Sequence, residues 1–97
     1  MQDFLAAFDA LPFGTFTGIA EGGRRYVCVK SGFAGGASQK LVAEELGRTD
    51  YISLNLYRTK AGALLRPCEM PEAKVIAFVR HLVVDAAPNG GRGVGSY

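Results

Sequence analysis

The fold is decided by the stretch DYISLNLYR, residues 50–58, in which apolar and polar residues alternate strictly. Side chains of a β-strand point in turn to its two faces, so this pattern predicts a strand with one buried and one exposed face. We expect the aliphatic residues to lie in the core and the tyrosines to face outward. The expected core residues are Ile52, Leu54 and Leu56.

Three further segments are expected to be strands, and all four pair as hairpins. The Thr- and Phe-rich residues 13–20 precede the turn Glu21-Gly22-Gly23 and a second strand, residues 24–30. Further along the chain, a short turn at residues 59–62 joins the alternating stretch to a strand at residues 63–70. Pro67 cannot donate a ladder hydrogen bond, so this last strand is expected at an edge of the sheet.

Three segments predict helices with an apolar stripe. The first covers residues 1–11 and ends at Pro12; the last opens at Pro71. The middle one, residues 39–46, follows the potential N-cap Ser38 and contains the helix formers AEEL, although a strand is an alternative there. The stripes are Phe4, Leu5, Phe8 and Leu11; Leu41, Val42 and Leu46; and Val75, Ile76, Val79, Leu82 and Val83.

The order of these elements, α-β-β-α-β-β-α, predicts an α+β fold. A four-stranded, largely antiparallel sheet with three helices packed on one face would bury every apolar stripe. The 97 residues suffice for one domain, which we assign to residues 1–87, and the Gly-rich residues 88–97 are expected to form a flexible tail. The opposite face of the sheet is then left open to solvent or to a partner.

Composition excludes several classes of protein. Lys and Arg number 11 against 9 Asp and Glu, and the net charge of +2 is far below that of a dedicated duplex-DNA binder. Two cysteines cannot build a disulfide framework. There is no apolar run long enough to span a membrane and no signal peptide, so a soluble, cytoplasmic protein is expected.

Catalytic and metal-binding residues are not evident. Cys28, Cys68 and His81 are dispersed and form no C-x-x-C pair, which makes a zinc site improbable. Cys68 with His81 as its base is the one conceivable nucleophilic pair, but their contact is not assured and no oxyanion hole accompanies them. We therefore predict a protein that is not an enzyme and holds no metal or cofactor.

The open face of the sheet is the expected binding site. Residues 24–60 carry a net charge of +4, from seven basic and three acidic residues, and include the second and third expected strands. Val27 and Val29 are the better core candidates of the second strand, which leaves its polar residues outside. Tyrosine and arginine supply contact area, a polar group and little entropy loss. The expected partner-binding residues are Arg24, Tyr26, Lys30, Tyr51, Asn55 and Tyr57, with Arg58 and Arg66 close by.

Two kinds of partner fit such a face. A protein would bury the tyrosines and arginines as anchors, whereas single-stranded nucleic acid would stack its bases on the tyrosines. The modest net charge favours a protein. A second copy of the chain could also cover the face, or the tyrosines could simply be solvated, so both a monomer and a homodimer stay open.

A resemblance adds to this expectation. Residues 50–57, the segment RPCEMP at 66–71 and the helix expected at 75–82 are similar in overall character to small phage and mobile-element proteins of the anti-CRISPR inhibitor type. The likeness covers about the central half of the chain. It implies a non-enzymatic inhibitor that binds a subunit of a CRISPR effector and blocks DNA recruitment or cleavage. Such proteins share no sequence signature, so the resemblance assigns no role to any residue.

Overall fold

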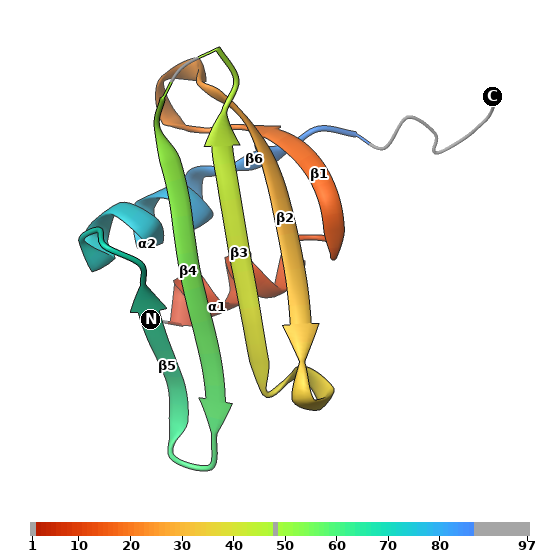
Figure 1. Cartoon of the computed structure of the whole chain (residues 1–97), viewed down its shortest axis with the longest axis vertical. Coiled ribbons are helices and arrows are strands. Elements are labelled where there is room, and N and C mark those ends of the chain that lie inside the picture. Colours follow the sequence, from red (N-terminus) through yellow and green to blue (C-terminus); the bar gives the residue numbers. More distant parts are fainter. Residues whose placement is uncertain (1, 48, 87–97) are drawn as a thin grey trace, which may run out of the picture.

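The computed structural model describes residues 2–47 and 49–86, which form a curved sheet with helices on one side (Figure 1). The helices are α1 (Gln2–Ala10) and α2 (Glu72–His81), with short 3-10 turns η1 (Glu21–Gly23) and η2 (Ala34–Gly36). The strands are β1 (Gly14–Ile19), β2 (Arg25–Phe33), β3 (Ser38–Glu45), β4 (Tyr51–Thr59), β5 (Gly62–Pro67) and β6 (Val83–Val84). The flexible tail expected at residues 88–97 lies outside the described residues.

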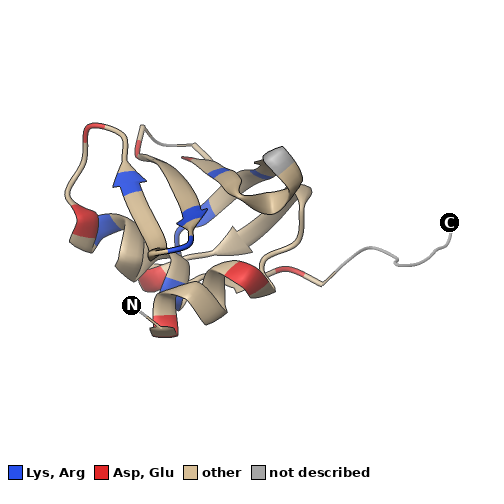
Figure 2. Ribbon diagram, turned by 90° about the horizontal axis from the view of Figure 1, so that it is seen from below, with Lys and Arg blue, Asp and Glu red and all other residues tan. Residues whose placement is uncertain are grey.

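The sheet has six strands in the order β5-β4-β3-β2-β1-β6, and every neighbouring pair is antiparallel. It curves into a half-barrel, and both α-helices lie on its concave side (Figure 2). We call the side toward the helices the inner face and the opposite side the outer face. The predicted four-stranded sheet with three helices is therefore wrong, since the described residues form two α-helices and two additional strands.

The middle helix predicted at residues 39–46 is strand β3. Its backbone pairs with β2 on one side and β4 on the other over almost its whole length, and such ladders outweigh the helix propensity of the AEEL segment. Gln39, Leu41 and Ala43 point into the core, whereas Lys40 and Val42 lie on the outer face. Residues 38–45 do alternate with a period of two, but the small side chain of Ala43 makes the apolar positions harder to recognise.

The two terminal helices and the alternation in β4 are confirmed. Helix α1 buries Phe4 and Phe8, and α2 buries Val75, Phe78 and Val79. These side chains meet the aliphatic residues of β4, all of which are at most 1% exposed: Ile52, Leu54 and Leu56. β5 is an edge strand that ends at Pro67, as its missing N–H requires.

The chain after α2 departs from the expected helical stripe. Leu82 ends the helix, and Val83, which was predicted to face the core, is 67% exposed in the two-residue strand β6. This strand lies so close to β1 that a Cβ at Gly18 would come within 2.9 Å of the Val83 carbonyl oxygen. Gly18 is thus the residue that lets β6 dock. No helix within residues 2–47 and 49–86 has the length and apolar character needed to cross a bilayer.

Candidate functional site

The outer face is the largest surface that the helices leave uncovered. Cross-strand pairing sets it out in rows that run across the sheet. The central row is Val29–Val42–Ser53, and the rows on either side of it are Ser31–Lys40–Asn55–Arg66 and Val27–Glu44–Tyr51. The next row contains Phe33, Ser38, Tyr57 and Leu64. Apolar residues thus occupy the centre, with tyrosines and charged residues around them.

Several large apolar and aromatic residues of the outer face are exposed to solvent. Val29 and Tyr51 are each 44% exposed, Leu64 is 43% exposed and Tyr57 is 37% exposed. Isolated exposed apolar residues are normal on a soluble protein, whereas a contiguous group on one rigid surface marks a binding site. Because these residues sit on paired strands, a partner would lose little backbone entropy by ordering them.

Four of the eight predicted binding residues lie on the outer face. They are Tyr51, Asn55, Tyr57 and Arg66. The other four are directed toward the helix side: Arg24, Tyr26, Lys30 and Arg58. The orientation predicted for β2 is therefore wrong, because Tyr26, Cys28 and Lys30 are at most 2% exposed while Val29 faces solvent.

Lys30 is buried because helix α1 supplies it with partners. Its Nζ donates hydrogen bonds to the carbonyl oxygens of Phe8 at 2.7 Å and Leu11 at 2.9 Å. It also lies 4.6 Å from the ring centroids of Phe8 and Phe13. The last carbonyls of a helix have no intrahelical donor and carry partial negative charge, so an ammonium group there caps the helix. Burial lowers the pKa of Lys30.

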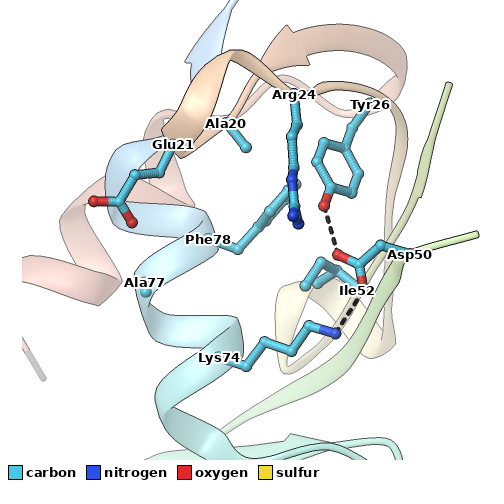
Figure 3. Close-up of a pocket in the computed structure, with 9 residues that line it drawn as sticks. All are labelled: Ala20, Glu21, Arg24, Tyr26, Asp50, Ile52, Lys74, Ala77 and Phe78. Atoms are coloured by element: carbon cyan, nitrogen blue, oxygen red, sulfur yellow. Dashed lines mark hydrogen bonds and ion pairs between the residues drawn. The ribbon is translucent and has the colours of Figure 1, made fainter. Parts of the chain in front are cut away.

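Tyr26 belongs to a hydrogen-bond chain at the opposite end of the inner face (Figure 3). Its hydroxyl donates to Asp50 at 2.6 Å, and Lys74 of α2 donates to the other oxygen of the same carboxylate at 2.7 Å. Burial and the neighbouring carboxylate raise the pKa of Tyr26 to about 12, and the two donors lower the pKa of Asp50. The ring of Tyr26 meets Phe78 edge-on at 4.8 Å between centroids. This chain joins β2, β4 and α2.

The pocket beside this chain is small. Arg24 reaches into it alongside Tyr26 (Figure 3). The Nε of Arg24 is 3.9 Å from the carboxylate of Glu45. The pocket has a volume of about 140 Å³, which is less than half that of the smallest usual ligand pockets, about 300 Å³. Arg24 lines this pocket together with residues of α2, so it lies on the helix side and does not join the outer face.

Arg58 closes the far end of the inner face. Its Nε donates to Oε1 of Gln39 at 3.3 Å, and its guanidinium forms an ion pair with Asp9 of α1. Arg58 pairs across the ladder with Ala63, which places both on the helix side. Its charge is thus used to hold α1 against the sheet.

The predicted site missed several residues of the outer face. Val29 and Val42 at its centre were assigned to the core or to a helix stripe, and Lys40 and Glu44 were placed on a helix. Period-two alternation in residues 38–45 was the signal that could have identified them. The local sequence around Leu64 and Phe33 does not indicate which face of the sheet they lie on. Only the pairing of their strands determines it.

Both cysteines are free thiols, and they differ in burial. Cys28 is fully buried, and burial raises its pKa to about 11, which disfavours the reactive thiolate. The Nδ2 of Asn55 donates a hydrogen bond to the Sγ of Cys68 at 3.7 Å. Within residues 2–47 and 49–86 there is no cluster of three or more His, Cys, Asp or Glu side chains able to hold a metal ion.

Comparison with models of protein families, with curated proteins and with solved structures finds no match to this chain.

Proposed function

We propose that this chain is a small non-enzymatic binding protein that acts by docking its outer face on another protein and so occupying that protein's surface. The observation that carries the proposal is the exposure of Val29, Tyr51, Tyr57 and Leu64 on one face of a rigid sheet. Tyrosine is enriched in protein-binding surfaces, where its ring supplies apolar contact area and its hydroxyl a hydrogen bond.

The distribution of charge favours a protein over single-stranded nucleic acid as the partner. A strand-binding sheet needs a dense row of cations along the path of the phosphates. With Arg24, Lys30 and Arg58 directed to the helix side, the middle rows of the outer face hold Lys40 and Arg66 as cations, offset by Glu44. This mixture suits a partner surface that is itself apolar with both signs of charge.

The similarity to anti-CRISPR inhibitors stays a prediction. It fits a stoichiometric inhibitor of a nucleic-acid-handling protein, and a CRISPR effector subunit is the partner it implies. We place this activity in the cytoplasm, since both cysteines are free thiols and Cys68 is partly exposed, which suits a reducing compartment.

Site-specific photocrosslinking in the native host tests the proposal. A photoreactive amino acid replaces Tyr57 on the outer face or, as the matched control, His81, which is exposed on α2. We expect position 57 to give a discrete adduct with one other protein, which is lost when Val29→Arg is added. Position 81 should not give this adduct.

Several outcomes would contradict the proposal. They are no adduct at position 57, the same adducts at both positions, or adducts made only of two copies of this chain. Fluorescence anisotropy with an oligo-dT and an oligo-U strand at low salt tests the alternative partner, single-stranded nucleic acid. Binding that falls steeply with salt and is lost in a Tyr51→Ala, Tyr57→Ala variant would instead favour nucleic acid.

A further inference from the structure

Two opposite charges flank the centre of the outer face on its central strand β3. Lys40 and Glu44 lie on either side of Val42, and all three side chains point away from the helices. Residues four apart on a strand are separated by about 13 Å, which is too far for an ion pair within one chain. The described residues provide no ion-pair partner for either charge.

This arrangement is complementary to itself. Two sheets that pack face to face are related by a two-fold axis lying between them. An axis that runs across the strands, along the row Val29–Val42–Ser53, reverses the strand direction in the second copy. Lys40 then lies over the partner subunit's Glu44, and Glu44 lies over the partner subunit's Lys40. Val29 and Val42 meet their own copies at the centre.

A two-fold axis that runs along β3 is disfavoured. An axis parallel to the strands would place Lys40 over the partner subunit's Lys40 and Glu44 over the partner subunit's Glu44. Like charges placed directly opposite each other at an interface repel and disfavour that pairing. Sheets pack about 10 Å apart, a gap that a lysine and a glutamate side chain can bridge together. Of these two arrangements, charge therefore favours the one in which the strands of the two copies run in opposite directions.

We propose that a second copy of this chain covers the outer face, with two symmetric Lys40–Glu44 ion pairs around an apolar centre of Val29 and Val42. Four strands, β2 to β5, spaced about 4.8 Å apart and up to nine residues or about 30 Å long give a footprint of about 570 Å² per chain. This is below the roughly 800 Å² of a standard interface, and the convex curvature of the face limits it further. The dimer is therefore weak and reversible.

The inference goes beyond the proposed function, because it concerns what covers the outer face when no foreign protein is bound. A reversible dimer would keep the exposed valines and tyrosines out of water and would compete with the partner for the same surface. The foreign partner is not needed to test it. A failure of self-association would leave the photocrosslinking result unaffected, and the reverse also holds.

Sedimentation equilibrium of the purified full chain over a wide concentration range, combined with charge reversal, tests the proposal. The wild type should shift from the mass of one chain to that of two. Lys40→Glu or Glu44→Lys alone puts like charges face to face, so each variant should dissociate at least about 10-fold more readily. Mixing the two single variants should restore a dimer, because one then carries two negative and the other two positive charges. The double variant K40E/E44K should also dimerise.

Charge-matched controls separate this contact from a general effect of charge. Lys60→Glu in the β4–β5 turn and Glu21→Lys in η1 make the same changes at exposed positions off the outer face, and both should dimerise as the wild type does. Thermal melting verifies that each variant is folded. A wild type that stays monomeric, or a dimer that both single reversals leave intact, would overturn the proposal. Failure of the mixed variants to associate would do so as well.

Discussion

The two faces of the sheet carry the same kinds of polar side chain in opposite situations. Lys30 on the inner face is 2% exposed and is held by the carbonyl oxygens of Phe8 in α1 and Leu11 just after it, whereas Lys40 on the outer face has no such partner among the described residues. Tyr26 is likewise fixed by Asp50 and Phe78, while the ring of Tyr57 is 37% exposed. Residue type alone thus does not separate the two faces.

The comparison shows what decides the burial of a polar group in this protein. A buried ammonium or hydroxyl group is tolerated only where another element supplies hydrogen-bond partners. The inner face receives them from α1, α2 and the β3–β4 connection, whereas no helix of the described residues covers the outer face. The inner polar residues therefore stabilise the fold, and the outer ones are available for binding.

Truncating the two tyrosines should give the largest contrast between the faces. Tyr26→Ala empties a core position and leaves Asp50 with one donor fewer, so we expect a loss of about 3 to 5 kcal/mol in the free energy of unfolding. Tyr57→Ala should cost less than about 1 kcal/mol. Urea denaturation measures both. Where Tyr26→Ala does not fold, Tyr26→Phe keeps the ring and should cost about 1 kcal/mol. Equal costs for the two alanine variants would contradict the assignment of faces.

Replacing each lysine by methionine should give the next largest contrast. Lys30→Met keeps much of the buried stem but removes the donor to the carbonyl oxygens of Phe8 and Leu11, and we expect a loss of about 2 to 3 kcal/mol. Lys40→Met, the same change on the neighbouring strand, should lie within about 0.5 kcal/mol of the wild type. Chemical denaturation at low protein concentration measures the difference. A larger loss of stability in Lys40→Met than in Lys30→Met would contradict the assignment of Lys30 to the inner face and Lys40 to the outer face.

Acid should weaken the inner face through Asp50. Hydrogen bonds from Lys74 and Tyr26 lower the pKa of Asp50, so its ionised form adds stability above the ordinary aspartate pKa of about 3.9. That contribution is lost as the pH falls through the lowered pKa of the folded state. The free energy of unfolding should therefore fall less steeply below about pH 4 in Asp50→Asn than in the wild type.

A surface carboxylate provides the control for this pH dependence. The side chain of Asp3 is 82% exposed and lies 3.8 Å from Arg80, so Asp3→Asn makes the same chemical change outside the inner face. The measurement is denaturant unfolding at a series of pH values between about 2 and 6, which brackets the ordinary carboxylate range. An unchanged slope in Asp50→Asn would show that its hydrogen bonds are not retained in solution.

The sequence predicts those parts of the fold that have a strong local period. The stretch at 50–58 and the helices at both ends are confirmed, because their apolar residues recur at strand or helix spacing. Strand β3 was missed, since its local propensity is helical and only pairing on both edges makes it a strand.

The candidate site was predicted only in part for a related reason. In β2, Val27 and Val29 are more apolar than Tyr26 and Lys30, so hydropathy favoured the wrong face. Burial of Lys30 depends on carbonyl oxygens of α1 that lie about twenty residues earlier in the chain. The alternation of β4 did place Tyr51, Asn55 and Tyr57 on the outer face, because its inward residues are all aliphatic.

Thiol labelling at two adjacent positions of β2 tests the central claim most directly, namely that this strand turns Cys28 inward and Val29 outward. With Cys68→Ser as background, native Cys28 is compared with a Val29→Cys, Cys28→Ala variant at low protein concentration. We expect the thiol at position 29 to react as fast as an unstructured one, and Cys28 to react only as the protein unfolds. Rapid labelling of Cys28 together with protection at position 29 would contradict the account.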